Sequence, residues 1–201
     1  MKKMIWLTTS SVLILVFIVP AILAAGLKMI PVNNQPGYNP DLRLSIYKTR
    51  EISQKFIAKS DNLVAIGTSI RNPNLKNKKD VIFNLYDDSG NLIRNSVLNG
   101  LNLEDGSFVK FVFPVIPDSL EKEYSFTISS PESGPEETIE VFIINEPEST
   151  SGITNYTYMG EVHSGGIPIA AFSQPKSKWS VIKDVYSNWL SRLLFHHSQK
   201  S

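Results

Sequence analysis

The chain of 201 residues contains no cysteine. Without thiols it can form neither a disulfide framework, a thiolate zinc site, an iron–sulfur cluster nor a cysteine nucleophile. Histidine is also scarce. The segment around His163 lacks the GxSxG and GxxxxGK[ST] patterns, and the adjacent His196 and His197 would point about 100° apart on a helix. The residues therefore predict no enzyme, no metal site and no cofactor.

The chain also lacks a strong excess of positive or negative charge. The chain has 20 Lys and Arg against 19 Asp and Glu, and 19% of its residues are charged. This balance argues against a nucleic-acid-binding protein, which neutralises phosphates, and against a disordered chain. The total hides segregation, because residues 101–161 hold two basic and twelve acidic residues whereas both flanking regions are basic. We interpret the acidic middle as a solvated surface.

One long hydrophobic run is present near the N-terminus. The 24 residues between Lys3 and Lys28 carry no charge, and about 20 residues suffice to span a bilayer. We predict an N-terminal transmembrane anchor in residues 1–28, with Trp6 as an interfacial aromatic. A cleaved secretory signal is the alternative, since Ala24-Ala25-Gly26 provides a small-residue cleavage site. Both interpretations export the rest of the chain.

The positive residues fix the expected orientation. Lys2 and Lys3 precede the hydrophobic run on a short tail, which the positive-inside rule keeps in the cytoplasm. We therefore expect a single-pass protein of a bacterial cell membrane, with a cytoplasmic N-terminus and an extracytoplasmic domain. An exported chain without cysteine needs an ordinary hydrophobic core for its stability.

The exported part shows the pattern of an all-β protein. Residues 29–50 contain three prolines and no sustained periodicity, which predicts a stalk. From Glu51 to residue 173, short runs of β-branched and aromatic residues alternate with turn formers and predict an antiparallel β-sandwich. The expected strands are Ile52–Ala58, Leu63–Ile70, Val81–Tyr86, Leu92–Val97, Phe108–Phe113, Tyr124–Ser129, Thr138–Ile144, Thr154–Met159 and Ile167–Phe172.

Two of these strands alternate clearly. Phe111 and Phe113 share one face of their strand, and Phe126 and Ile128 share one face of theirs, so we expect all four in the core. Between two other strands, the sequence Asp87-Asp88-Ser89-Gly90-Asn91 predicts a tight hairpin. A structural calcium ion on Asp87 or Asp88 is the alternative, but the loop lacks the spacing of a dedicated calcium site.

A resemblance rests on three stretches, FIAKSDNLVAIGTSI, IFNLYDDSGNLIRNSVL and FVKFVFPVIPDSLEKEYSFTISS. They resemble the jelly-roll, carbohydrate-binding-module-like (galactose-binding-like) sandwiches of bacterial envelope proteins, which are often associated with membrane glycosyltransferases. The likeness covers roughly residues 51–172, and its motifs are the D-x-x-G hairpin followed by Arg94 and the run from Phe111 to Ser119. The resemblance implies a place in the bacterial cell envelope near membrane glycosyltransferases, and it identifies no catalytic residues.

Sugar binding requires aromatic platforms beside polar groups. The predicted sandwich contains no tryptophan, which leaves Tyr86, Tyr124, Tyr156 and Tyr158 as platforms. Tyr156 and Tyr158 share one face of their strand by the two-residue period, so we take them as the candidate ligand-binding pair. Each tyrosine is also a candidate for simple core packing.

In the last segment, residues 174–201, the spacing of the apolar residues changes. Apolar residues recur at three- and four-residue steps from Trp179 to Leu194 and predict an amphipathic helix near Lys178–His197, which Ser177 or Ser180 could cap. This helix could pack on the sandwich, lie at the membrane interface or join a partner helix.

Two functions remain open at this point. The first is a non-enzymatic, membrane-anchored binding domain for a cell-envelope carbohydrate, with membrane lipid, an envelope glycan and a membrane glycosyltransferase as expected partners and no nucleic acid. The second is a protein scaffold or accessory subunit of an envelope polysaccharide assembly complex.

Overall fold

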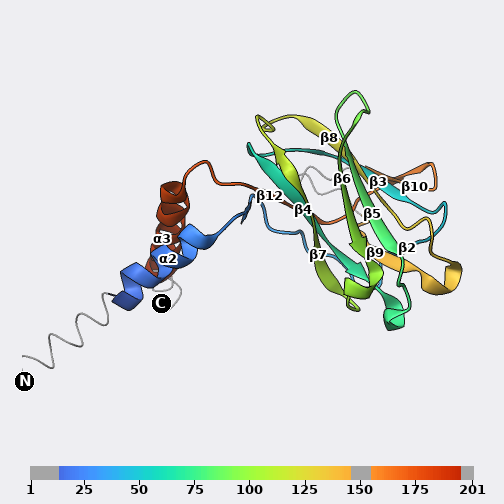
Figure 1. Cartoon of the computed structure of the whole chain (residues 1–201), viewed down its shortest axis with the longest axis horizontal. Coiled ribbons are helices and arrows are strands. Elements are labelled where there is room, and N and C mark those ends of the chain that lie inside the picture. The colour runs from blue at the N-terminus through green and yellow to red at the C-terminus, as the bar shows by residue number, and fades with distance from the viewer. Residues whose placement is uncertain (1–13, 146–154, 196–201) are drawn as a thin grey trace, which may run out of the picture. The chain divides into compact units, whose positions relative to one another are not determined.

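The computed structural model describes residues 14–145 and 155–195, which belong to two compact units (Figure 1). Residues Pro31–Gln174 form the first unit, a β-sandwich that we call the sandwich. Met1–Ile30 and Pro175–Ser201 together form the second unit, which we call the helical unit.

The strands follow the sequence pattern closely. All nine expected strands are present, with ends shifted by one to three residues. Three further strands, β1, β2 and β11, were not expected. The twelve strands are β1 Ile30–Pro31, β2 Arg43–Ile46, β3 Ile52–Ile57, β4 Leu63–Arg71, β5 Asp80–Tyr86, β6 Leu92–Asn99, β7 Ser107–Ile116, β8 Glu123–Ser129, β9 Ile139–Phe142, β10 Asn155–Tyr158, β11 Glu161–Ser164 and β12 Ile169–Ser173.

The strands form two antiparallel sheets, which confirms the predicted all-β sandwich. The first sheet has the order β1-β12-β4-β9-β2, with β7 also paired to β4. The second sheet has the order β11-β10-β3-β8-β5-β6. Short 3-10 turns at Pro73–Leu75, Gly100–Asn102 and Pro135–Glu137 lie in the connections.

The core lies between the sheets and is centred on Phe83 of β5. Its ring stacks on Phe126 of the neighbouring strand at 5.3 Å and on Phe111 of the opposite sheet at 4.8 Å. Phe111, Phe113, Phe126 and Ile128 are all at most 5% exposed, as their alternation predicts. The aromatic cluster therefore joins the two sheets and fixes which face of each strand points inward.

A buried glutamine adds a polar link near one edge of the second sheet. Gln54 of β3 is 3% exposed. Its amide group donates to the carbonyl oxygen of Ile167 and accepts from the backbone N–H of the same residue. Because both polar ends of the side chain are satisfied, the burial of this amide does not incur the penalty of an unpaired polar group.

The predicted stalk at residues 29–50 is wrong. This segment supplies β2, which pairs with β9 from Arg43↔Phe142 to Ile46↔Ile139, and Ile46 is fully buried. Asn33 also bonds to the backbone of β12, accepting from Ala171 and donating to Ile169. Prolines interrupt the periodicity of the segment, yet single apolar residues between them still pack on the core. The sandwich therefore begins near Pro31 rather than at Glu51.

The helical unit is formed by the two terminal segments of the chain. A π-helical turn, Ile14–Ile18, leads into α2, Val19–Gly26, and the C-terminal helix α3 covers Lys178–Phe195. Ser177 caps α3, because its hydroxyl accepts from the backbone N–H of Trp179 at 3.2 Å. No helix in the described ranges is long and apolar enough to span a bilayer. Residues 1–13 of the predicted anchor lie outside those ranges.

The central aromatic cluster makes a first prediction. Replacing Phe111 by alanine leaves a cavity beside Phe83, so we expect the free energy of unfolding to fall by about 3 to 5 kcal/mol. Phe108 is the matched control, because it lies on the opposite face of the same strand and is 42% exposed. Its replacement by alanine should cost at most about 1.5 kcal/mol. Urea unfolding checks both values, and equal losses would contradict the register of β7.

Candidate functional site

A row of side chains crosses the outer face of the second sheet. The strand register aligns one residue from each of the six strands, from β11 at one edge to β6 at the other. Five of the six side chains in this row carry a hydroxyl or an amide. The row reads Val162, Thr157, Ser53, Thr127, Asn84 and Asn95.

A second, shorter row runs beside the first. It joins Lys55, Ser125 and Tyr86, which the register of β3, β8 and β5 places next to one another. The second row and the first four residues of the first row line a groove with a volume of about 590 Å³, within the usual range of ligand sites. We call this feature the sheet groove. It is lined by Ser53, Gln54, Lys55, Tyr86, Gly90, Ser125, Thr127, Asn155, Tyr156, Thr157 and Val162.

The floor of the sheet groove offers free hydroxyl groups. Ser53, Ser125, Thr127 and Thr157 belong to the hydrogen-bonded ladders through their backbones. Within the described residues, their side-chain hydroxyls bond to no other group of the protein. Each hydroxyl can both donate and accept a hydrogen bond. The floor can therefore bind a ligand that itself carries donors and acceptors, in exchange for water.

The groove is open and has little charge. Among the described residues that line it, Lys55 is the only ionic one, and its ammonium group lies 2.7 Å from the carboxylate of Glu123. Both side chains are well exposed, so this ion pair contributes little to stability and can open at small cost. Tyr86 is half-buried and provides an aromatic surface over β5, whereas Val162 is 69% exposed on β11.

The rings of the two tyrosines selected from the sequence pack on the core side of β10, although Tyr156 is also among the residues that line the sheet groove. Tyr156 is 6% exposed and stacks on His163 at 5.2 Å, and burial raises the pKa of its phenol. Tyr158 donates its hydroxyl to the carbonyl oxygen of Ser45 at 2.8 Å. The rings share one face, as the two-residue period predicts, but that face is turned to the core. Their assignment as a ligand surface remains a prediction, and this packing does not favour it.

The outward residues of the same strands were visible in the sequence. In EYSFTIS, Ser125 and Thr127 alternate with the core residues, so the pattern already placed them on one exposed face. Tyr86 was among the four candidate tyrosines. What the sequence does not contain is the order of the strands, which brings these residues beside Ser53 and Thr157.

The hairpin after β5 is a turn held by its own aspartate. Asp87 accepts from the backbone N–H groups of Ser89 and Asn91 at 3.0 and 2.8 Å, and from the side-chain amide of Asn91 at 3.0 Å. These bonds lower the pKa of Asp87, the side-chain bond of Asn91 most of all. Gly90, which lines the sheet groove, has a φ of 81° that glycine adopts without strain.

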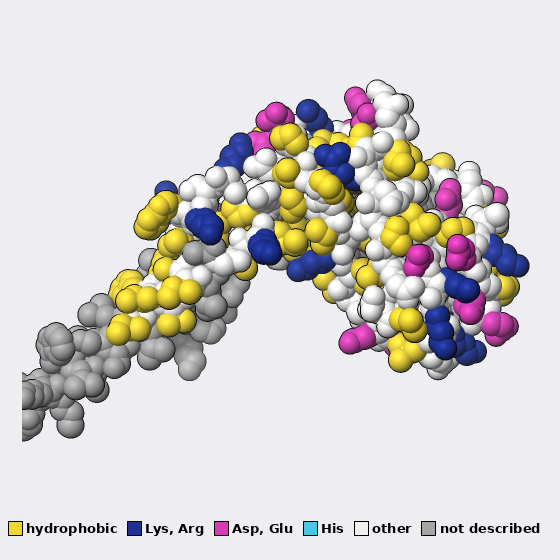
Figure 2. Space-filling view, in the orientation of Figure 1, with side chains coloured by type: hydrophobic (Ala, Val, Ile, Leu, Met, Phe, Trp, Pro, Cys, Tyr) yellow, Lys and Arg dark blue, Asp and Glu magenta, His cyan; other side chains and the backbone are white. Residues whose placement is uncertain are grey.

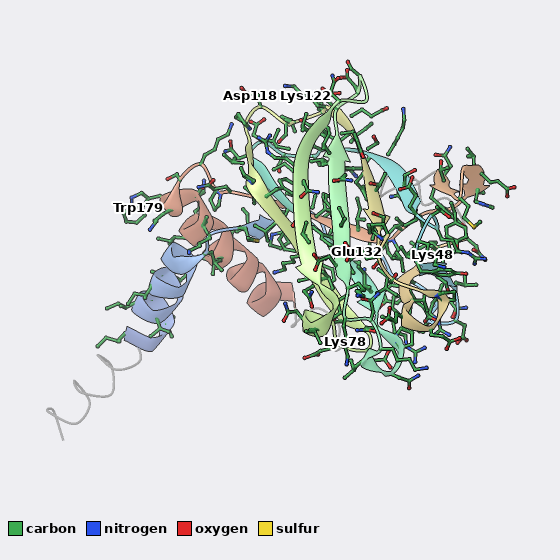
Figure 3. The ribbon with its side chains drawn as sticks, turned by 45° about the vertical axis from the view of Figure 1, so that its right-hand side comes forward. Lys48, Lys78, Asp118, Lys122, Glu132 and Trp179 are labelled. Carbon is green, nitrogen blue, oxygen red and sulfur yellow. The ribbon has the colours of Figure 1, made fainter. Side chains whose placement is uncertain are left out.

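A second hollow lies on the other side of this hairpin. It has a volume of about 560 Å³, and four carboxylates are among its lining residues, which are Asp87, Asp88, Ile93, Ile116, Glu121, Lys122, Glu123 and Tyr124. Figure 3 shows Lys122 and Asp118 at this end of the sandwich, opposite to Lys48 and Lys78. In the described parts of the chain, no three His, Asp or Glu side chains lie close enough together to hold a metal ion. His196 and His197 lie outside those parts.

Comparison with known proteins gives no family. No protein-family model matches the chain, and no curated protein matches it. Among solved structures, an arabinose-bound α-L-arabinofuranosidase is similar over 75% of this chain, with 11% identity and a TM-score of 0.37. This chain covers 24% of the length of that enzyme. The flagellar cap protein FliD from Escherichia coli aligns over 90% of this chain and 67% of its own, with 10% identity and a TM-score of 0.13.

The lowered pKa of Asp87 makes a second prediction. A carboxyl group whose pKa is lower in the folded state stabilises the fold above its unfolded pKa, and this contribution is lost as the pH falls through the folded pKa. Asp87→Asn keeps an acceptor for the turn but does not titrate. We therefore expect the variant to lose less stability than the wild type between pH 5 and pH 2, measured by urea midpoints. An identical loss in both proteins would show that this carboxylate does not stabilise the hairpin.

Proposed function

We propose that the chain is a non-enzymatic, exported binding protein whose sheet groove holds a cell-envelope carbohydrate. The observation that supports this most is the floor of the groove, where hydroxyls from β3, β8 and β10 point outward without a partner in the described protein. A carbohydrate matches this floor, because its own hydroxyls both donate and accept. The ring of Tyr86 supplies the apolar surface on which a sugar face can pack.

The shape of the groove favours a chain of sugars over a single ring. The lining residues extend from β11 to β5, which is four strand spacings, or about 19 Å at ~4.8 Å each. A ligand lying across the strands would contact the outward residues Val162, Thr157, Ser53 and Thr127 in turn. The lining side chains in the described ranges carry one charge, on Lys55, so neutral or weakly acidic carbohydrates fit better than strongly charged ones.

The proposed location follows from the N-terminal sequence. We propose a single-pass protein of a bacterial cell membrane, anchored by residues 4–27 with the sandwich outside, as the charge pattern of Lys2 and Lys3 indicates. An external sandwich would meet envelope carbohydrate directly. We propose further that the sandwich is a jelly-roll, galactose-binding-like module that works beside a membrane glycosyltransferase.

A protein scaffold is the alternative function. The observation in its favour is the outer side of β7, where Phe108, Val112 and Val115 are 42, 49 and 38% exposed. Such residues can pack against a partner protein of an envelope assembly complex. The two functions differ in the face of the sandwich that they use, so variants on each face separate them.

The sheet groove makes a third prediction. The full-length protein should bind members of an array of bacterial envelope oligosaccharides. For the tightest of these, Tyr86→Ala should weaken binding about ten-fold, equivalent to ~1.4 kcal/mol, because a stacking surface is lost. Thr127→Val should weaken it about five-fold by removing one hydroxyl of the floor. Titration calorimetry measures both effects.

Tyr47→Ala is the matched control for the tyrosine variant. Tyr47 packs beneath the guanidinium of Arg50 at 4.8 Å and does not line the groove, so its loss should leave the affinity unchanged. Binding that is insensitive to Tyr86 and Thr127 but sensitive to Tyr156→Ala and Tyr158→Ala would move the site to the pair selected from the sequence. If the array shows no bound glycan at millimolar concentration, the carbohydrate proposal fails and the scaffold function remains.

A further inference from the structure

The charges of the chain are divided between its two compact units. The helical unit, Met1–Ile30 and Pro175–Ser201, contains eight basic residues and one acidic residue, which gives a formal charge of +7. The sandwich, Pro31–Gln174, contains twelve basic and eighteen acidic residues, which gives −6. A chain of net charge +1 therefore consists of a strongly basic part and an acidic part, which respond in opposite ways to an anionic surface.

The helical unit also exposes large apolar side chains. Ile14, Ile18 and Ile22 recur at four-residue steps, which places them close to one side of the N-terminal helix, and they are 50, 50 and 65% exposed. Phe17 is 54% exposed next to them. Figure 2 shows hydrophobic side chains covering the visible face of this helix. A surface of this kind fits an apolar medium better than water.

The two helices of the unit pack on each other through one aromatic pair. Phe17 and Tyr186 stack at 6.2 Å with an interplanar angle of 27°, and the Tyr186 hydroxyl donates to the carbonyl oxygen of Phe17. This contact links α3 to the exposed apolar surface of the N-terminal helix. The C-terminal helix, whose partner the sequence left open, therefore packs within the unit that contains the N-terminal segment.

The beginning of α3 combines an aromatic ring with cations. Trp179 is 79% exposed in the first turn, and its side chain extends away from the helix (Figure 3). Lys178 and Lys183 are exposed on the same helix, and Lys28 is exposed just after α2. Tryptophan prefers the level of the lipid head groups, and lysines there bind anionic phosphates. This combination matches the chemistry of the bilayer interface.

From these observations we infer that the helical unit binds an anionic lipid bilayer through α3 as well as through its N-terminal segment, with Trp179 at head-group depth and Lys178 and Lys183 on the lipid phosphates. The inference goes beyond carbohydrate binding, because it concerns residues outside the sheet groove. It makes α3 a second membrane contact beside the N-terminal segment. Since the sandwich is acidic, the anionic surface attracts the helical unit alone.

All three tryptophans of the chain belong to the helical unit, so the tryptophan fluorescence of the full-length protein reports on this unit alone. In a Trp6→Phe/Trp189→Phe background, Trp179 is the single emitter. We expect its emission to be blue-shifted in vesicles that contain phosphatidylglycerol, relative to vesicles of phosphatidylcholine alone. Added salt should reduce the shift, because it screens the lysines. Lipids brominated near the head group should quench this tryptophan.

The lysines are tested in the same background. Lys178→Glu/Lys183→Glu should abolish the difference between the two lipids, whereas Lys48→Glu/Lys78→Glu, which makes the same charge change at exposed positions of the sandwich, should preserve it. Emission that is typical of water in both lipids would overturn the inference, and so would a blue shift that is equal in both. Oligosaccharide binding, assayed separately with Tyr86→Ala, does not depend on this outcome, so failure of one proposal is distinguishable from failure of the other.

Discussion

The stacking of Phe83 on Phe111 across the sandwich is the interaction on which the rest of the structure depends. It joins β5 of one sheet to β7 of the other at a ring distance of 4.8 Å, with Phe126 packed on the same ring at 5.3 Å. Because side chains alternate along a strand, burying these rings forces Asn84 and Thr127 to the outer face. A shift of one residue would bury the outward side chains of these strands and expose the aromatic rings. The sheet groove is thus a consequence of the core.

Local sequence patterns predicted what depends on neighbours along the chain. Alternation in FVKFVF and EYSFTIS predicted both the strands and their buried faces, and the Asp87 hairpin followed from its turn formers. Local patterns did not predict features that depend on contacts between residues far apart in the sequence. β2 is short and follows three prolines, and only its pairing with β9 makes it a strand. The period of two showed that Tyr156 and Tyr158 share a face, but it cannot tell which face is turned to the core. The groove itself arises from the order of the strands, which no local pattern contains.

Each half of the proposed activity uses a different part of the chain. The sandwich is acidic and contains no tryptophan, and its outer groove presents hydroxyls and a tyrosine ring to a neutral, polar ligand. The helical unit is basic, contains every tryptophan and exposes isoleucines, as a lipid-binding element requires. Two units of opposite charge in one chain would allow a carbohydrate to be held close to a membrane without competition between the two surfaces for the same partner.

Ligand binding in the sheet groove is tested most directly by mapping the contact on the full-length protein. Backbone amide chemical shifts would be recorded while the tightest oligosaccharide of the array is added. We expect the largest shifts on the outward residues Ser53, Ser125, Thr127 and Thr157 and on Tyr86. Shifts confined to the Asp87 hairpin and its acidic hollow, or to the outer side of β7, would contradict it.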